Sequence, residues 1–458
     1  MSNIGSSILA FIVAIGVLVS VHEFGHFWVA RRLGFKVLRF SIGFGRPLVR
    51  WRGGAPDYTE YWLSAIPLGG YVKMLDEREG PVAGVELDRS FNHRPIWQRI
   101  LVLLAGPAFN FLFAIVAYWA MFSSGVPGIK PVIGAVIEES VAARAGIKPN
   151  DEIEAVGGRP VETWEGATLA ILDELLAKGR IDLKVREPSG DTRSVSLDVR
   201  GRAAELTEPS ALYGGIGIRP GPVLPAVIAA VAPDSAAEQA GLKAGDQVLR
   251  ADDRKIADWE QWVDYIRKRP GENVTLEVRR GNENLTVPVT IGSVEEKGVS
   301  VGRIGAQRLA ELPPGTLERL RAEQRYGVLE ALPRGIEKTW QMTSLTLRML
   351  GHMVVGEVSL KNMSGPITIA AVAGDSAQAG FGTFLNFLAV VSISLGIINL
   401  VPVPLLDGGQ VLYQLVEWIK GSPLSDRALA VGQQIGVFFL IVLMSFVFYN
   451  DLTRIFGS

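Results

Sequence analysis

Four stretches of the chain are apolar over about 20 residues, the length that a helix needs to cross the hydrocarbon core of a bilayer. They begin near Ile4, Ile100, Ser376 and Ala428. With a mean hydropathy of +0.25, they predict a polytopic α-helical membrane protein with four transmembrane helices. The first stretch lacks a basic segment before it and carries a His/Glu cluster where a signal peptide would be cleaved, so we expect it to be retained.

Composition excludes several classes of function. The 458 residues include 46 basic and 47 acidic side chains, which give a formal net charge of −1. Without a basic excess to neutralise phosphates, we expect no nucleic-acid partner. The chain has no cysteine, which excludes disulfides and thiol catalysis and leaves His, Asp and Glu as candidate metal ligands.

Basic residues after the first apolar stretch predict the orientation of the chain. Met1 to Ser20 is uncharged, whereas seven basic residues follow the stretch: Arg31, Arg32, Lys36, Arg39, Arg46, Arg50 and Arg52. Because basic loops stay in the cytoplasm, we expect the N-terminus outside and the end of the first span at the cytoplasmic face. The later spans then alternate, which places residues from about 125 to 375 outside.

His22-Glu23-Phe24-Gly25-His26 ends the first apolar stretch. In a helix, side chains four residues apart share one face and lie about 6 Å apart along the axis, so His22 and His26 could converge on one ion. This is the H-E-x-x-H arrangement, in which two histidines bind zinc and the glutamate, here Glu23, is the general base. The alternative is a polar patch at the membrane interface, which leaves the cost of ionisable groups in an apolar segment unexplained.

A third ligand is needed, since a catalytic zinc usually has three protein ligands and an open position. The strongest candidate is Asp407, which follows Pro402 and Pro404 and precedes Gly408 and Gly409. It closes the third apolar stretch on the cytoplasmic side, at the depth expected for the histidines. The alternative is a helix-ending turn in which Asp407 only caps the next helix.

Between the first two spans, residues 58–75 are rich in aromatic and β-favouring side chains and are broken by Pro67, Gly69 and Gly70. The pattern predicts a membrane-associated β-hairpin or looped strand. Its open edge, around Tyr71 and Val72, could bind an extended substrate by strand addition. A hairpin that only packs the loop is an equally good interpretation.

The external segment contains an internal repeat. Ala145-Gly146-Ile147, followed by Asp151, recurs as Ala240-Gly241-Leu242 and Asp246, an offset of 95 residues. With β-branched stretches on both sides, each copy resembles a PDZ domain of the bacterial envelope-protease kind. PDZ domains take a peptide as an added strand in a groove, so a peptide in the PDZ groove is a candidate partner; the alternative is that one or both copies are spacers.

From residue 311 to 375 the pattern is weaker. Apolar residues at near-helical spacing predict an amphipathic helix on the outer membrane surface, although an ordinary packing face gives the same pattern. They are Leu329, Leu332, Ile336, Trp340 and Leu347. His352 and His93 lack companion ligands in the sequence, so we interpret the first as structural and the second as interfacial.

Taken together, these motifs resemble the site-2 protease family of M50-type intramembrane zinc metalloproteases, most closely its RseP-type bacterial envelope branch with two external PDZ domains. The resemblance also covers Gly43-Phe44-Gly45, Ala105-Gly106-Pro107 with Asn110, and Asn399 with Leu406-Asp407-Gly408. It implies His22, His26 and Asp407 as Zn²⁺ ligands and Glu23 as catalytic base. It further implies that Asn399 helps to hold the substrate backbone.

The resemblance also implies a location and a substrate class. We expect a multi-pass protein of the bacterial inner membrane, with periplasmic PDZ domains and an active site near the cytoplasmic face. Its substrates would be single-pass membrane proteins of the anti-sigma factor type, after external trimming, and leftover signal peptides. The rival interpretation is a non-enzymatic membrane adaptor, which would need neither Glu23 beside His22 nor Asp407 at matching depth.

The expected organisation has five parts. They are a first membrane half with the H-E-x-x-H helix (1–127), PDZ domain 1 (128–208), PDZ domain 2 (209–296), an amphipathic region at the outer membrane surface (297–375) and a second membrane half (376–458).

Overall fold

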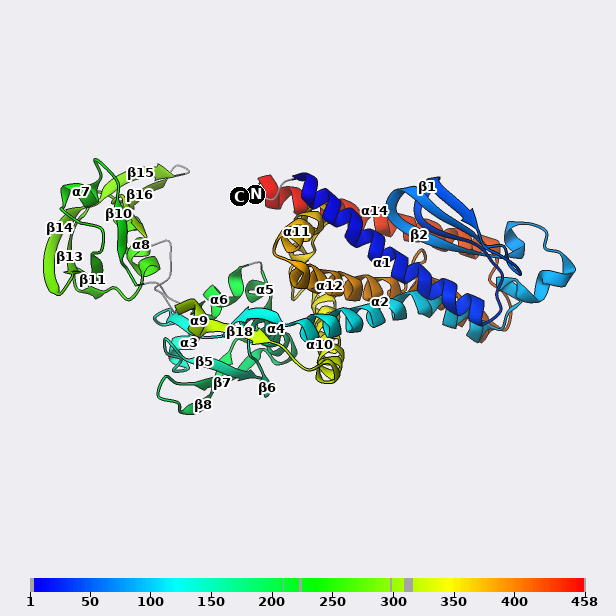
Figure 1. The fold of residues 1–458 in the computed structure, drawn as a ribbon, viewed down its shortest axis with the longest axis horizontal. Helices are drawn as coiled ribbons and strands as arrows, with labels where there is room; N and C mark the ends of the chain where they lie inside the picture. Colours follow the sequence, from blue (N-terminus) through cyan, green and yellow to red (C-terminus); the bar gives the residue numbers. More distant parts are fainter. Residues whose placement is uncertain (1–3, 209, 222–224, 297–298, 309–315, 457–458) are drawn as a thin grey trace. The chain divides into compact units, whose positions relative to one another are not determined.

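The structure is a computed structural model that describes residues 4–208, 210–221, 225–296, 299–308 and 316–456. The chain divides into two compact units (Figure 1). We call them the helical unit, which comprises Met1–Val126, Thr207–Pro209 and Glu323–Ser458, and the β-rich unit, which comprises Pro127–Leu206 and Ser210–Ala322.

Among the described residues, four helices are long and apolar enough to cross a membrane. They are α1 (Ile4–Arg32), α2 (Ile96–Ser124), α12 (Phe381–Leu400) and α14 (Asp426–Phe456). Each covers one predicted apolar stretch. The start of α12 is later than the predicted Ser376, because residues 366–378 form a separate helix and Gly380, with φ 116°, precedes the new one.

The helical unit also contains shorter or less apolar elements. They are β1 (Val37–Arg52), β2 (Glu60–Met74), α10 (Val328–Val354), α11 (Pro366–Gln378), α13 (Asp407–Lys420) and the 3₁₀ turns η1 (Glu77–Glu79), η2 (Gly84–Arg89), η3 (Phe91–His93) and η4 (Leu360–Asn362).

Helix α2 connects most of this unit, since it packs against α1, α10, α12 and α13. Small side chains allow the close approach. A Cβ atom on Gly25 of α1 would lie 2.5 Å from the Ala105 carbonyl oxygen of α2, and Ala114 and Ala117 of α2 are buried in a core shared with α12. Such contacts are typical of helix association in membranes. The position of α2 therefore constrains all four neighbours.

Helix α10 accounts for the predicted amphipathic segment. Its small residues Ala331, Gly335 and Thr339 are buried, and a Cβ atom on Gly335 would lie 3.0 Å from a backbone carbonyl of α2. The predicted apolar stripe lies elsewhere on the helix, since Leu329 is 88% and Trp340 is 70% exposed. A packing face within the chain therefore does not explain the stripe. Contact with lipid remains our prediction.

Residues 58–75 do not form a hairpin by themselves. They form one strand, β2, that pairs with β1. The sequence pattern did not reveal β1, because arginines and glycines interrupt the β-favouring residues of that strand. The register gives Ser41 two neighbours, Trp62 and Tyr71, so the two halves of β2 flank the first half of β1. In the described pairings, residues 70–73 therefore lie at an edge of this small sheet.

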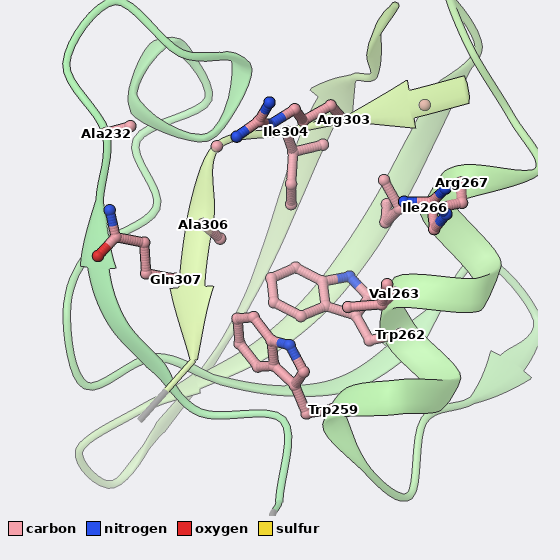
Figure 2. Close-up of a pocket in the computed structure, with 12 residues that line it drawn as sticks. Ala232, Trp259, Trp262, Val263, Ile266, Arg267, Arg303, Ile304, Ala306 and Gln307 are labelled. Carbon is pink, nitrogen blue, oxygen red and sulfur yellow. The ribbon is translucent and has the colours of Figure 1, made fainter. Parts of the chain in front are cut away.

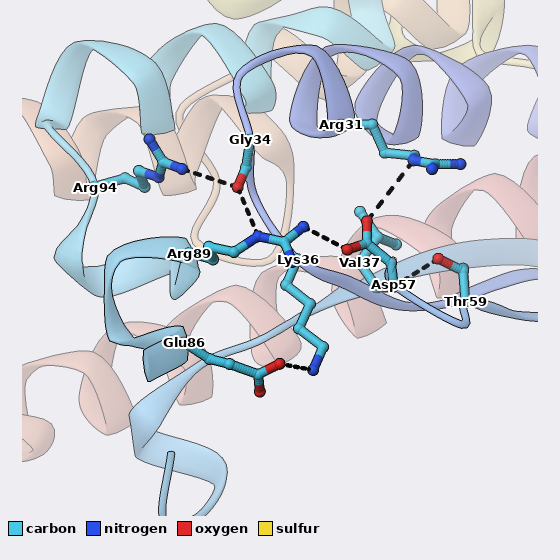
Figure 3. Close-up of polar contacts among 9 residues, drawn as sticks. All are labelled: Arg31, Gly34, Lys36, Val37, Asp57, Thr59, Glu86, Arg89 and Arg94. Carbon is cyan, nitrogen blue, oxygen red and sulfur yellow. Dashed lines mark hydrogen bonds and ion pairs between the residues drawn. The ribbon is translucent and has the colours of Figure 1, made fainter. Parts of the chain in front are cut away.

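Polar contacts hold the connection between β1 and β2 against the end of α1 (Figure 3). The buried Asp57 carboxylate accepts a hydrogen bond from Arg89 and lies 3.8 Å from Nε of Arg31. The Thr59 hydroxyl donates to the Val37 carbonyl at 2.8 Å. Since a buried carboxylate needs such cations to offset its lost hydration, these contacts fix the sheet relative to α1.

The β-rich unit contains two copies of one arrangement, which confirms the sequence repeat as a structural repeat. The first copy comprises β4 (Ile133–Val136), α3 (Val141–Arg144), β5 (Glu152–Val156), β6 (Arg159–Pro160), α4 (Trp164–Lys178), β7 (Arg180–Arg186), β8 (Thr192–Asp198), α5 (Ala203–Leu206), α6 (Ala211–Ile216) and β9 (Ile218–Pro220). The second comprises β10 (Ile228–Val231), α7 (Ala236–Gln239), β11 (Gln247–Ala251), β12 (Arg254–Lys255), α8 (Trp259–Arg267), β13 (Asn273–Arg280), β14 (Glu283–Thr290), β15 (Gly292–Glu296), β16 (Val299–Arg303) and β17 (Ala306–Arg308).

The short remaining elements are β3 (Val126–Ile129), α9 (Thr316–Leu320) and β18 (Arg321–Gln324). The two large sheets have matching strand orders, β6-β5-β7-β8 and β12-β11-β13-β14, and each copy closes with a two-stranded sheet, β4-β9 or β10-β17. The closing strands β9 and β17 lie beyond residues 208 and 296, the predicted ends of the two copies.

The aspartate of the repeated motif is buried in both copies. Asp246 accepts hydrogen bonds from the Lys243 amide at 2.8 Å and from Arg280 at 2.7 Å, and Asp151 accepts one from the Lys148 amide at 2.9 Å. Burial raises the pKa of Asp246, but the bonds from Arg280 and the amide outweigh it and hold the pKa below its usual range. The motif thus ties a tight turn to the sheet.

We predict that Asp246→Asn lowers the free energy of unfolding of the second copy by roughly 1.5–3 kcal/mol at pH 7, the usual value of a charge-assisted hydrogen bond. Because the folded pKa is lowered, this stabilisation is complete above the ordinary pKa and is lost as the pH falls through the lowered value. Urea unfolding of the full chain, followed by tryptophan fluorescence from neutral to acid pH, measures it. The exposed control Asp253→Asn should leave the fall in the free energy of unfolding at acid pH unchanged. An equal effect of the two substitutions on this pH dependence would contradict the prediction.

Candidate metal centre

Two histidines and an aspartate converge in the helical unit. His22 and His26 lie four residues apart on α1, and their Nε2 atoms are 3.2 Å apart. Oδ2 of Asp407, the first residue of α13, lies 3.1 Å from Nε2 of His22 and 3.5 Å from Nε2 of His26. The described residues contain no other group of three or more candidate metal ligands. The structure thus brings together the three predicted ligands from opposite ends of the chain.

The geometry fits a zinc ion. Ligand atoms about 2.0–2.2 Å from a tetrahedral zinc lie roughly 3.3–3.6 Å from one another, close to the three distances above. Nδ1 of His26 is 2.7 Å from the Val102 carbonyl oxygen, which can only accept, so Nδ1 carries the proton and neutral His26 presents a lone pair at Nε2. Oδ2 of Asp407 has no hydrogen-bond donor in the described part of the chain. A cation between these atoms would satisfy all of them.

The backbone around residues 400–409 places Asp407. Helix α12 ends at Leu400, and the chain turns back sharply before α13 begins. A Cβ atom on Gly408 would lie 2.3 Å from the Leu400 carbonyl oxygen, and one on Gly409 would lie 2.1 Å from that of Val403. Only glycine permits this approach, so the turn holds the carboxylate beside α1. Asn399, the predicted substrate-binding residue, is half-buried in the last turn of α12.

Helix α2 orients both imidazoles. Nδ1 of His22 lies 3.0 Å from the side-chain amide of Asn110, whose oxygen has no other partner in the described residues. Amide oxygen and nitrogen are assigned from the hydrogen-bond network, and with the oxygen toward His22 it accepts the Nδ1 proton and leaves Nε2 free. Such outer contacts set the tautomer of metal-binding histidines. Sequence spacing alone did not reveal this role of Asn110, although the residue belongs to the family motif.

Gly106 of α2 lies directly beneath the two rings. A Cβ atom there would lie 2.2 Å from Nε2 of His26 and 2.7 Å from Cε1 of His22. The floor of the site is therefore backbone, which leaves the space beside both Nε2 atoms open.

Glu23 lies next to the cluster and is 9% exposed. Gly70 of β2 packs against it, since a Cβ atom on Gly70 would lie 2.7 Å from Cγ of Glu23. The edge of the β1-β2 sheet thus packs against the Glu23 side chain. Of the two predicted substrate-binding residues next to Gly70, Tyr71 accepts a hydrogen bond from Arg39 at 3.3 Å, and Val72 packs against a core cluster of α1 and α2.

The two remaining histidines lie outside the cluster. His93 pairs with Glu77 at 2.6 Å, and His352 pairs with Glu357 at 2.6 Å. Both contacts are at partly exposed sites.

Comparison with known proteins assigns the family. A model of peptidase family M50 matches residues 10–443. The chain belongs to peptidase family M50. It is similar to regulator of sigma-E protease RseP of Escherichia coli (strain K12), with 42% identity over 448 residues that cover 97% of this chain and 98% of that protein. It is also similar to a putative zinc metalloprotease of Vibrio cholerae serotype O1, with 40% identity over 99% of this chain and 100% of that one.

Membership of family M50 makes this chain a metallopeptidase of the site-2 protease type and a multi-pass inner-membrane protein. The non-enzymatic adaptor interpretation is therefore wrong. Among solved structures, the PDZ domain of the SdrC-like protein from Listeria innocua matches with 24% identity and a TM-score of 0.17, and covers 18% of this chain and 91% of that one.

We predict that Gly106→Ala removes most of the metal from this M50 peptidase, because the new methyl group would occupy the space beside Nε2 of His26. Alanine favours a helix over glycine, so lower helix propensity cannot explain a loss. Elemental analysis of the purified protein measures bound zinc. The matched control is Gly16→Ala on α1, where a Cβ atom meets nothing within 4 Å. Native zinc content in Gly106→Ala would contradict the geometry.

Proposed function

We propose that this M50 peptidase is an intramembrane zinc metalloprotease that cuts the transmembrane segment of a single-pass membrane protein. The observation that carries the proposal is the convergence of His22, His26 and Asp407 beside Glu23, with both histidines inside a candidate membrane span. Relatives named zinc metalloproteases support Zn²⁺ as the metal.

The three ligands would hold the metal, and Glu23 would transfer protons. When bound, zinc supplies Lewis acidity that activates water and polarises a carbonyl group. Glu23 would accept the proton of the attacking water and deliver it to the leaving amide nitrogen, the role of a general acid and base. Its burial under Gly70 keeps bulk water away from the carboxylate. Asn110 and the Val102 carbonyl would keep both imidazoles in the tautomer that binds metal.

Substrate would reach this site as an unwound segment of a membrane helix. Residues 70–73 lie at an edge of the β1-β2 sheet and include Tyr71 and Val72. An edge strand offers backbone groups to an extended chain, which supports strand addition at these residues. Asn399, one residue before the Leu400 carbonyl that packs against Gly408, would hold the substrate backbone beside the turn that carries Asp407.

The distribution of charge supports one orientation. Basic residues after α1 favour the cytoplasm, which supports a metal site near the cytoplasmic face and a periplasmic β-rich unit. Relatives named regulator of sigma-E protease support single-pass proteins of the anti-sigma factor type as substrates, cleaved after external trimming in envelope stress signalling. Leftover signal peptides are a second substrate of the same shape.

We predict that Glu23→Gln keeps the zinc but loses about 10²- to 10⁴-fold in cleavage rate, the usual contribution of a general base. Zinc content and cleavage of a reconstituted single-pass substrate measure the two effects separately. His22→Ala is the companion variant and should lose both. Native turnover in Glu23→Gln would exclude the proposed role of this residue.

We interpret the two copies in the β-rich unit as PDZ domains with different binding capacities. In the first, Tyr213 packs edge-on against Trp164 at 5.3 Å and its hydroxyl bonds to Thr168. In the second, Trp259 and Val263, the counterparts of Trp164 and Thr168, line a cavity of about 360 Å³ between α8 and β17 (Figure 2). The first copy fills this side of its helix with its own side chain, so the second is the better candidate for a peptide.

Whether these domains recruit substrate or exclude it determines how the protease is regulated. A folded domain of the substrate cannot cross the bilayer and stays on the outer side. The external domains of the protease could therefore block bulky substrates and admit only those with little mass left outside. We favour such a size gate, because the candidate ligands His22, His26 and Asp407 all belong to the helical unit, so the β-rich unit contributes nothing to the chemistry.

We predict that deletion of both copies, residues 132–308, leaves the zinc site active and allows cleavage of substrates whose external domains are still attached. Comparing an untrimmed with a pre-trimmed substrate in the deletion variant measures this. Val263→Trp, which fills the groove of the second copy, should then leave both rates unchanged. If the domains instead recruit substrate, both variants slow the cleavage of every substrate.

A further inference from the structure

One face of α2 contacts both helices that carry the candidate metal ligands, α1 and α13. Arg99, Val102, Gly106 and Asn110 are spaced by three, four and four residues, so they share a face of the helix. Three of them touch the histidines: the Val102 carbonyl, the backbone of Gly106 and the Asn110 side chain. The fourth, Arg99, contacts α13, the helix that begins with Asp407.

Arg99 and Glu417 form a buried ion pair between α2 and α13. Nη1 of Arg99 lies 3.1 Å from Oε2 of Glu417, and the two side chains are 9% and 5% exposed. The other carboxylate oxygen accepts a hydrogen bond from the Leu424 amide at 3.1 Å and lies 3.8 Å from Arg78. Removing one member of such a pair is costly, because the other charge stays buried without its partner.

Apolar contacts between this end of α13 and the start of α2 are incomplete. An open pocket of about 580 Å³ lies between them and is lined by Trp97, Ile100, Leu415 and Trp418 among others, and the two tryptophans are 57% and 67% exposed. The other end of α13 is fixed by Gly408 and Gly409 against the preceding turn. The Arg99–Glu417 pair ties this end of α13 to α2, and we expect its loss to let α13 shift relative to the end that carries the Asp407 carboxylate.

We propose that the Arg99–Glu417 pair is a positioning contact that sets the third metal ligand. Glu417 is ten residues beyond Asp407, about 15 Å along a continuous helix. Because α2 also orients His22 and His26, the same helix places all three ligands relative to one another. This inference rests on the proposed metal role of His22, His26 and Asp407 and adds two residues that touch neither metal nor substrate.

The test measures zinc affinity by competition with a chelator, using full-length protein in detergent. We expect Glu417→Gln and Arg99→Met to weaken zinc binding about 10- to 100-fold, the usual effect of removing an outer contact of a metal ligand. The double variant Arg99→Glu/Glu417→Arg, which restores an ion pair with reversed charges, should recover part of the affinity. Glu337→Gln, which breaks the exposed Arg334–Glu337 pair on α10, is the matched control and should change nothing.

A second readout separates positioning from general stability. Glu417→Asp keeps the charge but shortens the side chain. In the Co²⁺-loaded protein it should alter the visible absorption bands, which report ligand geometry. The thermal midpoint of unfolding of the metal-free protein should stay unchanged. Native zinc affinity in both single variants, or spectra identical to wild type, would overturn the inference. If His22→Ala also retains zinc, the metal centre itself is misassigned; if only His22→Ala loses it, this inference alone fails.

Discussion

The structure depends on the cost of placing ionisable side chains inside an apolar helix. His22, Glu23 and His26 are all less than 10% exposed, within a helix whose other residues from Ile4 to Val21 carry no charge. Such groups are unfavourable in a membrane unless they are paired, hydrogen-bonded or bound to a cation. The surrounding elements supply each partner: a carbonyl for one imidazole, an amide for the other, and a carboxylate between them.

Helix α2 supplies most of these partners because it approaches α1 so closely. The contact of Gly25 with the Ala105 carbonyl brings the two backbones together, and this closeness allows Gly106 to form the floor beneath both rings. A larger residue at either glycine would separate the helices and leave the hydrogen bonds to Val102 and Asn110 unmade. Small residues in these two helices thus serve the geometry of the site as well as helix association.

The sequence predicted the parts of the site that have a local signature. His22 and His26 follow from helical spacing, and Asp407 follows from an acidic residue at matching depth beside prolines and glycines. Strand β1 could not be predicted, since its pairing with β2 is a long-range contact that its own residues signal weakly. The same holds for Asn110 and Arg99. A polar residue in an apolar helix indicates that it has a partner, but only the packing of α2 shows that the partner of Asn110 is His22 and that of Arg99 is Glu417. The closing strands of the two copies are hard to predict for a related reason, because β9 and β17 join their copies only through pairing with β4 and β10.

Two carboxylates, Asp451 and Asp407, show how the surroundings of a residue separate a structural role from a proposed metal-binding one. Asp451 of α14 is fully buried and accepts hydrogen bonds from the amides of Gly365, Ile367 and Thr368 and from the Thr368 hydroxyl. It thereby caps the first turn of α11, and it ties to this unit a span whose apolar window is only 11% buried. Every donor that it needs is already present. Asp407 lies at a helix start as well, yet its buried Oδ2 faces two Nε2 atoms that carry lone pairs in neutral imidazoles. These three acceptors repel one another unless a cation or a proton lies between them, so the arrangement favours a bound cation, as the proposed metal role requires.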